Sequence, residues 1–200
     1  MWSLGSGWND EAALAAAWRG ALPFPHLVID DLLPAPHLPE LLAILEEEPI
    51  ASYQADHFAF EATAPEPVTA ELRALRDDFA ATLGPVLARI TGKRLARADL
   101  RAYAYRPGDY LLPHSDHQEG LERRLAYAYY LPSPEPPVGG ELELYRCTLE
   151  HGAMTATEPA VLISPRANRL VVFEVSDVSL HQVREVLAGL RISLAGWFYP

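Results

Sequence analysis

The chain has 200 residues, half of them hydrophobic, and a formal net charge of -11. This length and hydrophobic fraction suffice for a substantial core, and we predict a single domain over residues 1–200. The acidic balance argues against nucleic-acid partners, because binding a phosphate backbone requires clustered Lys and Arg. The single cysteine, Cys147, excludes an intrachain disulfide framework and a cysteine-rich zinc site.

We expect a cytoplasmic protein with no membrane association. The N-terminal region lacks the charged start and long apolar core of a secretory signal, and no run approaches the roughly 18 apolar residues of a membrane helix. The oligomeric state is not predicted, because no coiled-coil heptads are visible in the chain.

Helical signals dominate the first half of the chain. Asn9 and Asp10 can cap a short helix that ends at Gly20. Residues 27–30 are a strand candidate, and leucines at helical spacing predict a helix near 37–47.

The strongest helix is predicted to begin after Pro67. Its apolar stripe consists of Leu72, Leu75, Phe79 and Leu83. We expect Gly84-Pro85 to break or kink this helix, and a second short helix to end at Gly92. Residues 52–62 alternate aromatic and polar side chains, and either a strand or an ordered loop beside a pocket fits them.

Short strands dominate the second half of the chain. About eight candidates follow residue 97, among them 98–105, 124–131, 140–145, 169–175 and 190–198. Together they predict a jelly roll. The expected fold class is therefore α+β with a mainly β core, in which residues 1–96 form a helix-rich supporting part and residues 97–200 form the catalytic core.

The most informative pattern is the segment YRPGDYLLPHSDHQ, which contains His114 and Asp116. Side chains on an extended strand alternate between faces, so these two residues project to the same side and can chelate one ion. His181 follows a strand-like run, and a sheet that folds back on itself would bring it opposite the pair. Two imidazoles and one carboxylate form a facial triad for Fe(II), which leaves positions open for substrate, cosubstrate and oxygen.

Arg191 lies on a predicted strand, ten residues after His181. An unpaired cation is costly to bury, so this guanidinium requires an anion. Because a guanidinium pairs bidentately with a carboxylate, Arg191 suggests a dicarboxylate cosubstrate whose other end chelates iron. An ordinary Arg-Glu salt bridge is the structural alternative.

Further residues accompany this pattern in a fixed order. They are Tyr105 before a Pro-Gly turn, Tyr129-Tyr130-Leu131, Gly139-Gly140-Glu141-Leu142, and Trp197. As an ordered set between about Leu100 and Tyr199, they resemble the Fe(II)/2-oxoglutarate-dependent dioxygenases of the prolyl 4-hydroxylase-like branch. The resemblance implies a double-stranded β-helix, a jelly roll of the cupin-like kind, with the N-terminal helices packed on its outside.

The resemblance also implies a role for each matched residue. The implied iron ligands are His114, Asp116 and His181. The implied 2-oxoglutarate contacts are Arg191, which pairs with the C5 carboxylate, and the assisting Tyr130 and Ser193. Residues on the substrate side of the pocket would be Tyr105, Arg123 and Trp197, for which ordinary aromatic packing is an equally open interpretation.

The implied reaction uses Fe(II), 2-oxoglutarate and O2 to hydroxylate an unactivated C–H bond, with release of succinate and carbon dioxide. The substrate is a small molecule, an amino acid or a peptidyl residue such as proline, and the sequence pattern does not separate these classes. Two alternatives remain. A cupin-like metal dioxygenase or isomerase would keep the triad without a use for Arg191, and a non-catalytic jelly-roll binding module would bind no metal. The polar segment 117–122 suits a lid over the pocket.

Overall fold

The computed structural model describes residue 2 and residues 4–200. Its α-helices are α1 (Glu11–Gly20), α2 (Leu38–Glu46) and α3 (Ala70–Thr91), and short 3-10 turns cover Ser6–Trp8 and Ala35–His37. The strands of the first half are β1 (His26–Ile29), β2 (Ile50–Ala55) and β3 (Phe58–Thr63). Those of the second half are β4 (Arg97–Ala98), β5 (Arg101–Tyr105), β6 (Tyr110–His114), β7 (Leu125–Leu131), β8 (Val138–Gly139), β9 (Leu142–Glu150), β10 (Ala153–Ile163), β11 (Leu170–Glu174), β12 (His181–Val183), β13 (Val186–Ala188) and β14 (Arg191–Tyr199).

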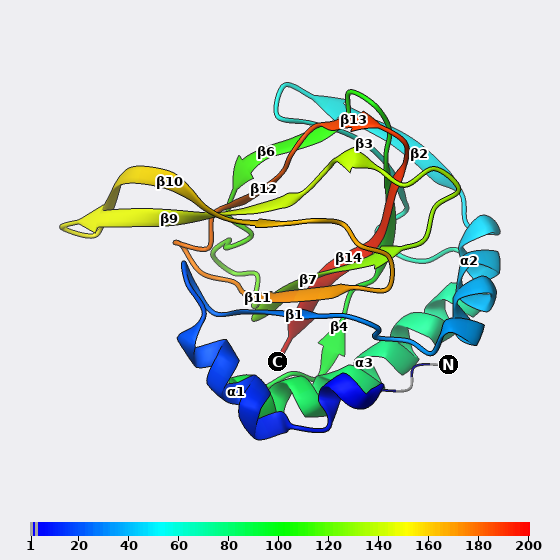
Figure 1. The fold of residues 1–200 in the computed structure, drawn as a ribbon, viewed down its shortest axis with the longest axis horizontal. Coiled ribbons are helices and arrows are strands. Elements are labelled where there is room, and N and C mark those ends of the chain that lie inside the picture. Colours follow the sequence, from blue (N-terminus) through cyan, green and yellow to red (C-terminus); the bar gives the residue numbers. More distant parts are fainter. Residues whose placement is uncertain (1, 3) are drawn as a thin grey trace.

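Most strands belong to one antiparallel sheet that curls back on itself (Figure 1). The strand order is β1-β11-β7-β14-β5-β3-β6-β12-β9-β10, with β2 paired to β3 and β4 paired to β14. The first five strands form one wall and the last four form the opposite wall, which is the predicted jelly roll. Strands β1 and β3 come from the first half of the chain, so that half contributes sheet as well as helices. The division into a supporting part and a core stays a prediction.

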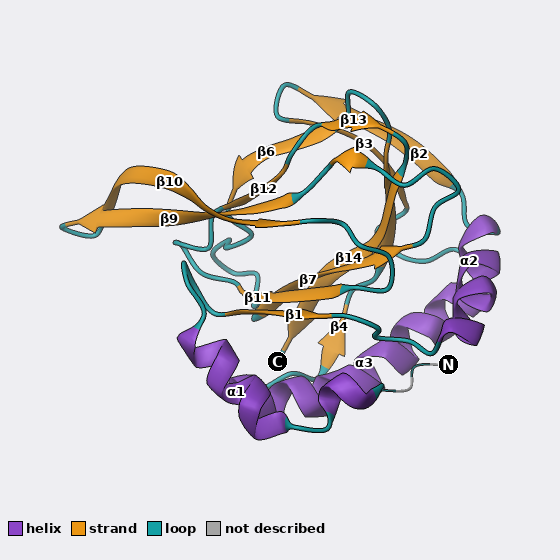
Figure 2. Ribbon diagram, in the orientation of Figure 1, coloured by secondary structure: helices purple, strands orange, loops and turns teal. Residues whose placement is uncertain are grey.

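The helices cover the outside of one wall. Figure 2 shows α1 and α3 beneath β1, β11, β7 and β4, whereas β6 and β12 of the opposite wall lie on the side away from these two helices. The main hydrophobic core joins the buried face of α3 to β7, β11 and β14. In the part of the chain that the structure describes, no helix is long and apolar enough to cross a membrane.

Helix α3 begins and ends where the sequence predicted helix ends, but it differs from the prediction at Pro85. The Thr69 side chain accepts a hydrogen bond from the Leu72 N–H at 3.2 Å, and Gly92 ends the helix with φ 72°. The helix does not break at Gly84-Pro85 and no separate second helix follows, since α3 continues to Thr91; a kink at Pro85 stays a prediction. Pro85 lies on the exposed side, where water can satisfy the carbonyl that loses its partner.

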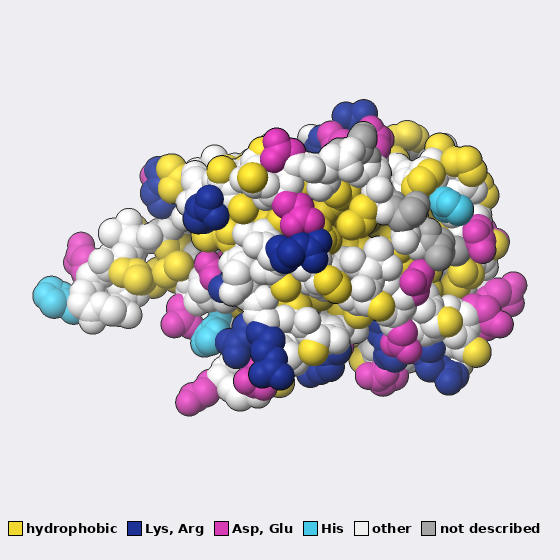
Figure 3. Space-filling model, turned by 90° about the horizontal axis from the view of Figure 1, so that it is seen from below, with side chains coloured by type: hydrophobic (Ala, Val, Ile, Leu, Met, Phe, Trp, Pro, Cys, Tyr) yellow, Lys and Arg dark blue, Asp and Glu magenta, His cyan; other side chains and the backbone are white. Residues whose placement is uncertain are grey.

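The two segments whose structure the sequence left open or missed are hairpins. Residues 52–62 fall within the β2–β3 hairpin, whose strands are in register from Ile50 with Thr63 to Ala55 with Phe58. The β9–β10 hairpin projects from the body in Figure 1 and Figure 3, and only its first residues were predicted as strand. Positive φ angles at His151 and Gly152 form its turn.

Figure 3 also shows Lys and Arg side chains among Asp and Glu on the helical face.

Phe79 is the side chain in α3 whose loss should cost the most stability. It is fully buried, and its ring lies 4.8 Å from Tyr127 and 5.6 Å from Phe198 between ring centroids. We expect Phe79→Ala to lower the free energy of unfolding by about 3–5 kcal/mol, because a cavity replaces a buried ring. Urea unfolding measures this loss. The control is Phe58→Ala on the β2–β3 hairpin, where the ring is half-exposed; an equal loss there would contradict this account of the core.

Candidate active site

Two neighbouring strands of the second wall bring the three predicted metal ligands together. His114 ends β6, Asp116 follows two residues later, and His181 begins β12. Strands β6 and β12 are antiparallel, with His181 directly opposite His114 in the register. The ligand atoms of all three residues lie within 4.8 Å of one another. The pairing of these two neighbouring strands therefore brings His181 opposite His114.

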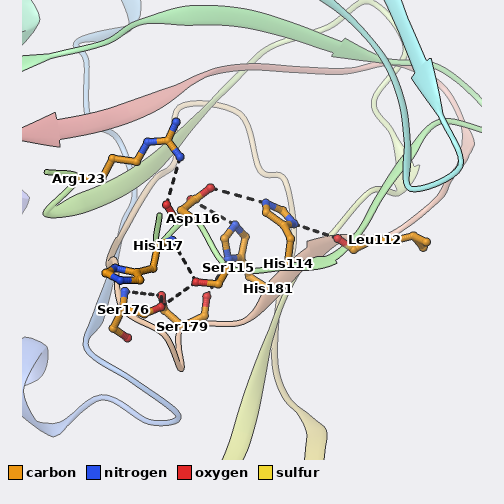
Figure 4. Close-up of polar contacts among 9 residues, drawn as sticks. All are labelled: Leu112, His114, Ser115, Asp116, His117, Arg123, Ser176, Ser179 and His181. Atoms are coloured by element: carbon orange, nitrogen blue, oxygen red, sulfur yellow. Dashed lines mark hydrogen bonds and ion pairs between the residues drawn. The ribbon is translucent and has the colours of Figure 1, made fainter. Parts of the chain in front are cut away.

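The triad has the geometry of a metal site. The Asp116 carboxylate lies 3.8 Å from His114 Nε2 and 3.6 Å from His181 Nε2 through its two oxygens. Each ring is oriented by its other nitrogen: His114 Nδ1 contacts the Leu112 carbonyl oxygen at 2.9 Å, and His181 Nδ1 contacts that of Ser179 at 3.0 Å. Such contacts to a carbonyl fix the Nδ1–H tautomer and direct Nε2 toward a metal. Figure 4 shows both rings turned toward Asp116.

Burial prepares His181 for ligation. Removal from water lowers the pKa of His181 below its usual range, against the opposing attraction of Asp116. The imidazole is therefore neutral at physiological pH, as a ligand must be. The loop before His181 is hydrogen-bonded to the segment that carries His114 and Asp116, because the Ser115 hydroxyl donates to the Ser176 carbonyl oxygen at 2.8 Å (Figure 4).

The triad opens into a cavity of about 440 Å³ between the two walls of the sheet. Its lining includes every predicted site residue except Tyr130, which adjoins Arg191. The β2–β3 hairpin supplies part of the rim through His57, Phe58 and Phe60. The sequence did not assign these three residues to the site; it left their segment open between a strand and an ordered loop beside a pocket. Residues 117–122 do not line the cavity, so the idea that they form a lid stays a prediction.

Arg191 reaches into the cavity from the start of β14 as a buried cation. Its side chain is only 3% exposed, and its guanidinium lies 4.7 Å from the Tyr105 ring centroid and 5.0 Å from that of Tyr130. Among the described residues, its polar contact is a 3.3 Å hydrogen bond to Ser193 Oγ. Its Nε and the Tyr130 hydroxyl are buried and have no hydrogen-bond partner in the part of the chain that the structure describes.

The surroundings of Arg191 are therefore suited to binding an anion. Two aromatic faces stabilise the charge without neutralising it, and unpaired donors point to a ligand that accepts hydrogen bonds. The alternative of an Arg-Glu salt bridge finds no support, since no ion pair joins Arg191 to a carboxylate among the described residues. Burial also raises the pKa of Tyr105, which keeps the neighbouring phenol neutral.

Arg123 and Trp197 line another side of the cavity. The Arg123 guanidinium carbon lies 3.5 Å from the Trp197 ring centroid, and its Nη1 donates to the Asp116 main-chain oxygen at 3.1 Å. Arg123 Nε and Trp197 Nε1 are buried without partners among the described residues. Both residues and Tyr105 line the cavity. The structure thus brings all the sequence-predicted residues to one place.

A jelly roll with two histidines and one carboxylate at its open end defines the class of a non-haem Fe(II) oxygenase. The model of the 2OG-Fe(II) oxygenase superfamily matches residues 100–199, which is half of the chain. The chain belongs to the 2OG-Fe(II) oxygenase superfamily, whose cofactor and cosubstrates are Fe(II), 2-oxoglutarate and O2.

Two curated relatives are prolyl hydroxylases by name. The chain is 41% identical over 139 residues to prolyl 3-hydroxylase OGFOD1 of Mus musculus, a match covering 67% of this chain and 24% of the mouse protein. It is 35% identical over 192 residues to OGFOD1 of Xenopus laevis, covering 90% of this chain and 35% of the frog protein. The chain therefore spans no more than about a third of these relatives.

Solved structures share the fold. A Pseudomonas putida prolyl-4-hydroxylase superposes with a TM-score of 0.66 and 23% identity, covering 93% of this chain and 98% of that chain. A prolyl hydroxylase from Trichoplax adhaerens, in complex with a hypoxia inducible factor peptide fragment, gives a TM-score of 0.70 and 15% identity, covering 96% and 90%. At these identities the likeness concerns the fold, and it confirms the predicted jelly roll.

Proposed function

We propose that this chain is an Fe(II)- and 2-oxoglutarate-dependent hydroxylase that acts on a prolyl residue of a peptide or protein. The observation that carries the proposal is the pairing of two features in one cavity. The triad of His114, Asp116 and His181 offers three ligand atoms, and the buried cation Arg191 has no carboxylate partner among the described residues. A metal ion and a dicarboxylate satisfy both.

In this proposal the chain's residues have distinct tasks. His114, Asp116 and His181 hold Fe(II) at one end of the cavity, and Arg191 anchors the far carboxylate of 2-oxoglutarate with Tyr130 and Ser193 beside it. The bound iron and 2-oxoglutarate supply the oxidising chemistry, with succinate and carbon dioxide as products. The protein supplies ligand geometry, an oriented cosubstrate and a cavity that excludes bulk water. A cupin-like enzyme that does not use 2-oxoglutarate would not explain the buried Arg191. A non-catalytic binding module would not explain the clustered His114, Asp116 and His181.

The prolyl substrate is supported by the relatives and by the cavity walls. Both curated relatives are named prolyl 3-hydroxylases. The rim and walls carry aromatic side chains from β2–β3, β5 and β14, which suit the apolar C–H groups of a pyrrolidine ring. The location in the cytoplasm and the lack of nucleic-acid or membrane partners stay predictions.

The test of this function starts without a substrate. The protein is titrated anaerobically with Fe(II) and then with 2-oxoglutarate, while the visible charge-transfer band of a chelated 2-oxo acid is followed. The loaded enzyme is then given O2 and a library of proline-containing peptides, and peptides that gain one oxygen are identified by mass spectrometry. Succinate formation that matches peptide oxidation supports the proposal. Iron binding without the band would instead support the cupin-like alternative.

Trp197 tests the substrate wall separately. Its Nε1–H is buried without a partner among the described residues, and we propose that it donates to the bound substrate. Trp197→Phe should lower kcat/KM for the identified peptide by about tenfold, the value of one buried hydrogen bond, and leave the KM for 2-oxoglutarate unchanged. Steady-state kinetics measure both. Trp18→Phe, in the core away from the cavity, is the control; an unchanged kcat/KM in Trp197→Phe would refute this role.

A further inference from the structure

Gly140 lies against the side chain that anchors the proposed cosubstrate. It follows β8 and adopts φ +68°, next to Gly139 at φ +80°. A Cβ atom placed on Gly140 would lie 2.9 Å from Arg191 Cδ and 2.9 Å from Val186 Cγ2. Ordinary contacts between carbon atoms are about 3.5–4.0 Å, so the space beside Gly140 is already filled by the Arg191 stem.

The backbone around Gly140 is held from the opposite strand. The Gly140 N–H donates to the Glu185 carbonyl oxygen at 3.1 Å, and Gly139 pairs with Val186 in the β8–β13 ladder. This segment cannot easily retreat from Arg191 without breaking these hydrogen bonds. An added methyl group would therefore be relieved by movement of the Arg191 stem or of Val186.

The arginine has little freedom to absorb such a movement. Its stem and the Val186 side chain both lie against Gly140, and its guanidinium lies over the faces of Tyr105 and Tyr130. A displaced stem would carry the guanidinium away from the carboxylate position it is proposed to serve. Misplacing a binding group by about 1 Å is sufficient to lose much of its contribution.

We propose that Gly140 is a positioning residue for the 2-oxoglutarate anchor: the absence of a side chain at this position lets Arg191 hold the conformation that binds the cosubstrate's far carboxylate. This inference rests on the proposed function, because it assumes that Arg191 binds 2-oxoglutarate. Gly140 itself touches neither the iron ligands nor, in this proposal, the substrate.

The test is equilibrium binding of 2-oxoglutarate to the anaerobic Fe(II)-loaded protein. Gly140→Ala should weaken 2-oxoglutarate binding by roughly 10- to 100-fold, with Fe(II) affinity unchanged because the triad lies on other strands. The matched control is Gly152→Ala at the tip of the β9–β10 hairpin, where φ is +82° and no atom lies within 4 Å of an added Cβ. That variant carries the same kind of backbone strain without the contact, and should bind 2-oxoglutarate like wild type.

A double-mutant cycle shows whether the effect passes through Arg191. In an Arg191→Ala background the stem is gone, so Gly140→Ala should cause little further loss. If Gly140→Ala does not fold, Gly140→Ala/Val186→Ala is compared with Val186→Ala, since the smaller residue 186 makes room while the Arg191 contact remains. Wild-type affinity in Gly140→Ala, equal affinity in that pair, or fully additive losses in the cycle would overturn the inference. Failure of wild type to bind 2-oxoglutarate would instead overturn the proposed function.

Discussion

Replacing His181 by alanine is expected to abolish tight Fe(II) binding and all 2-oxoglutarate-dependent oxidation. His181 offers one of the three ligand atoms in the cluster. It lies on β12, whereas His114 ends β6 and Asp116 follows it. Loss of a contact that merely orients a ligand typically costs about 10- to 100-fold in metal affinity, so loss of a ligand should exceed about 100-fold. Anaerobic Fe(II) titration of the purified variant measures this loss, and His114→Ala and Asp116→Ala should behave alike.

The control for this prediction is another histidine of the same cavity. His57 lines the rim but lies outside the metal cluster, so His57→Ala should bind Fe(II) like wild type. Circular dichroism and thermal unfolding show whether each variant is folded. A folded His181→Ala protein that retained wild-type Fe(II) affinity would remove the triad from the proposed mechanism.

The second prediction concerns Arg191, and it combines a loss of binding with no loss of stability. Arg191→Met should weaken 2-oxoglutarate binding by about 100-fold, or about 2.8 kcal/mol, the scale of a bidentate charged contact. Fe(II) affinity should not change. The melting temperature should stay the same or rise, because the variant replaces a buried cation that has no carboxylate partner among the described residues by an apolar side chain of similar length.

Arg169 provides the matched control because it is a structural arginine. Its Nε lies 2.7 Å and its Nη2 3.0 Å from the two carboxylate oxygens of Asp30. Arg169→Met should therefore lower the melting temperature, since it leaves Asp30 without this partner, and should keep 2-oxoglutarate binding. If Arg191→Met lost stability and kept 2-oxoglutarate affinity, Arg191 would be structural as well.

Much of the architecture was predictable because its signals are local. The cap Asp10 accepts a hydrogen bond from the Ala13 N–H at 2.9 Å, as its position before α1 predicted. The stripe from Leu72 to Leu83 is the buried face of α3. The same stripe continues through Val86, Leu87 and Ile90, and this explains why Pro85 does not end the helix: tertiary packing of the buried face outweighs one missing hydrogen bond on the exposed side.

Most of the β9–β10 hairpin was not predicted, because its strands carry weak local signals. Strand β10 is exposed along almost all of its length, so it lacks the alternation of buried and polar side chains by which strands are recognised. Its turn carried the available signal, since His151-Gly152 lies between runs that contain Leu and Thr. A hairpin of this kind is specified by its turn and by its pairing with the rest of the sheet.

The sequence by itself determined that His114 and Asp116 can act as a pair, because their spacing places both on one side of an extended segment whatever the rest of the chain does. It also pointed to His181 and Arg191 by residue type and order. Only the tertiary structure decided that His181 lies opposite His114, that Arg191 is buried beside two tyrosine faces with no carboxylate partner in the part of the chain that the structure describes, and that Gly140 leaves room for its stem. These properties depend on strands far apart in the chain, and burial and pairing between such strands exist only once the sheet has closed.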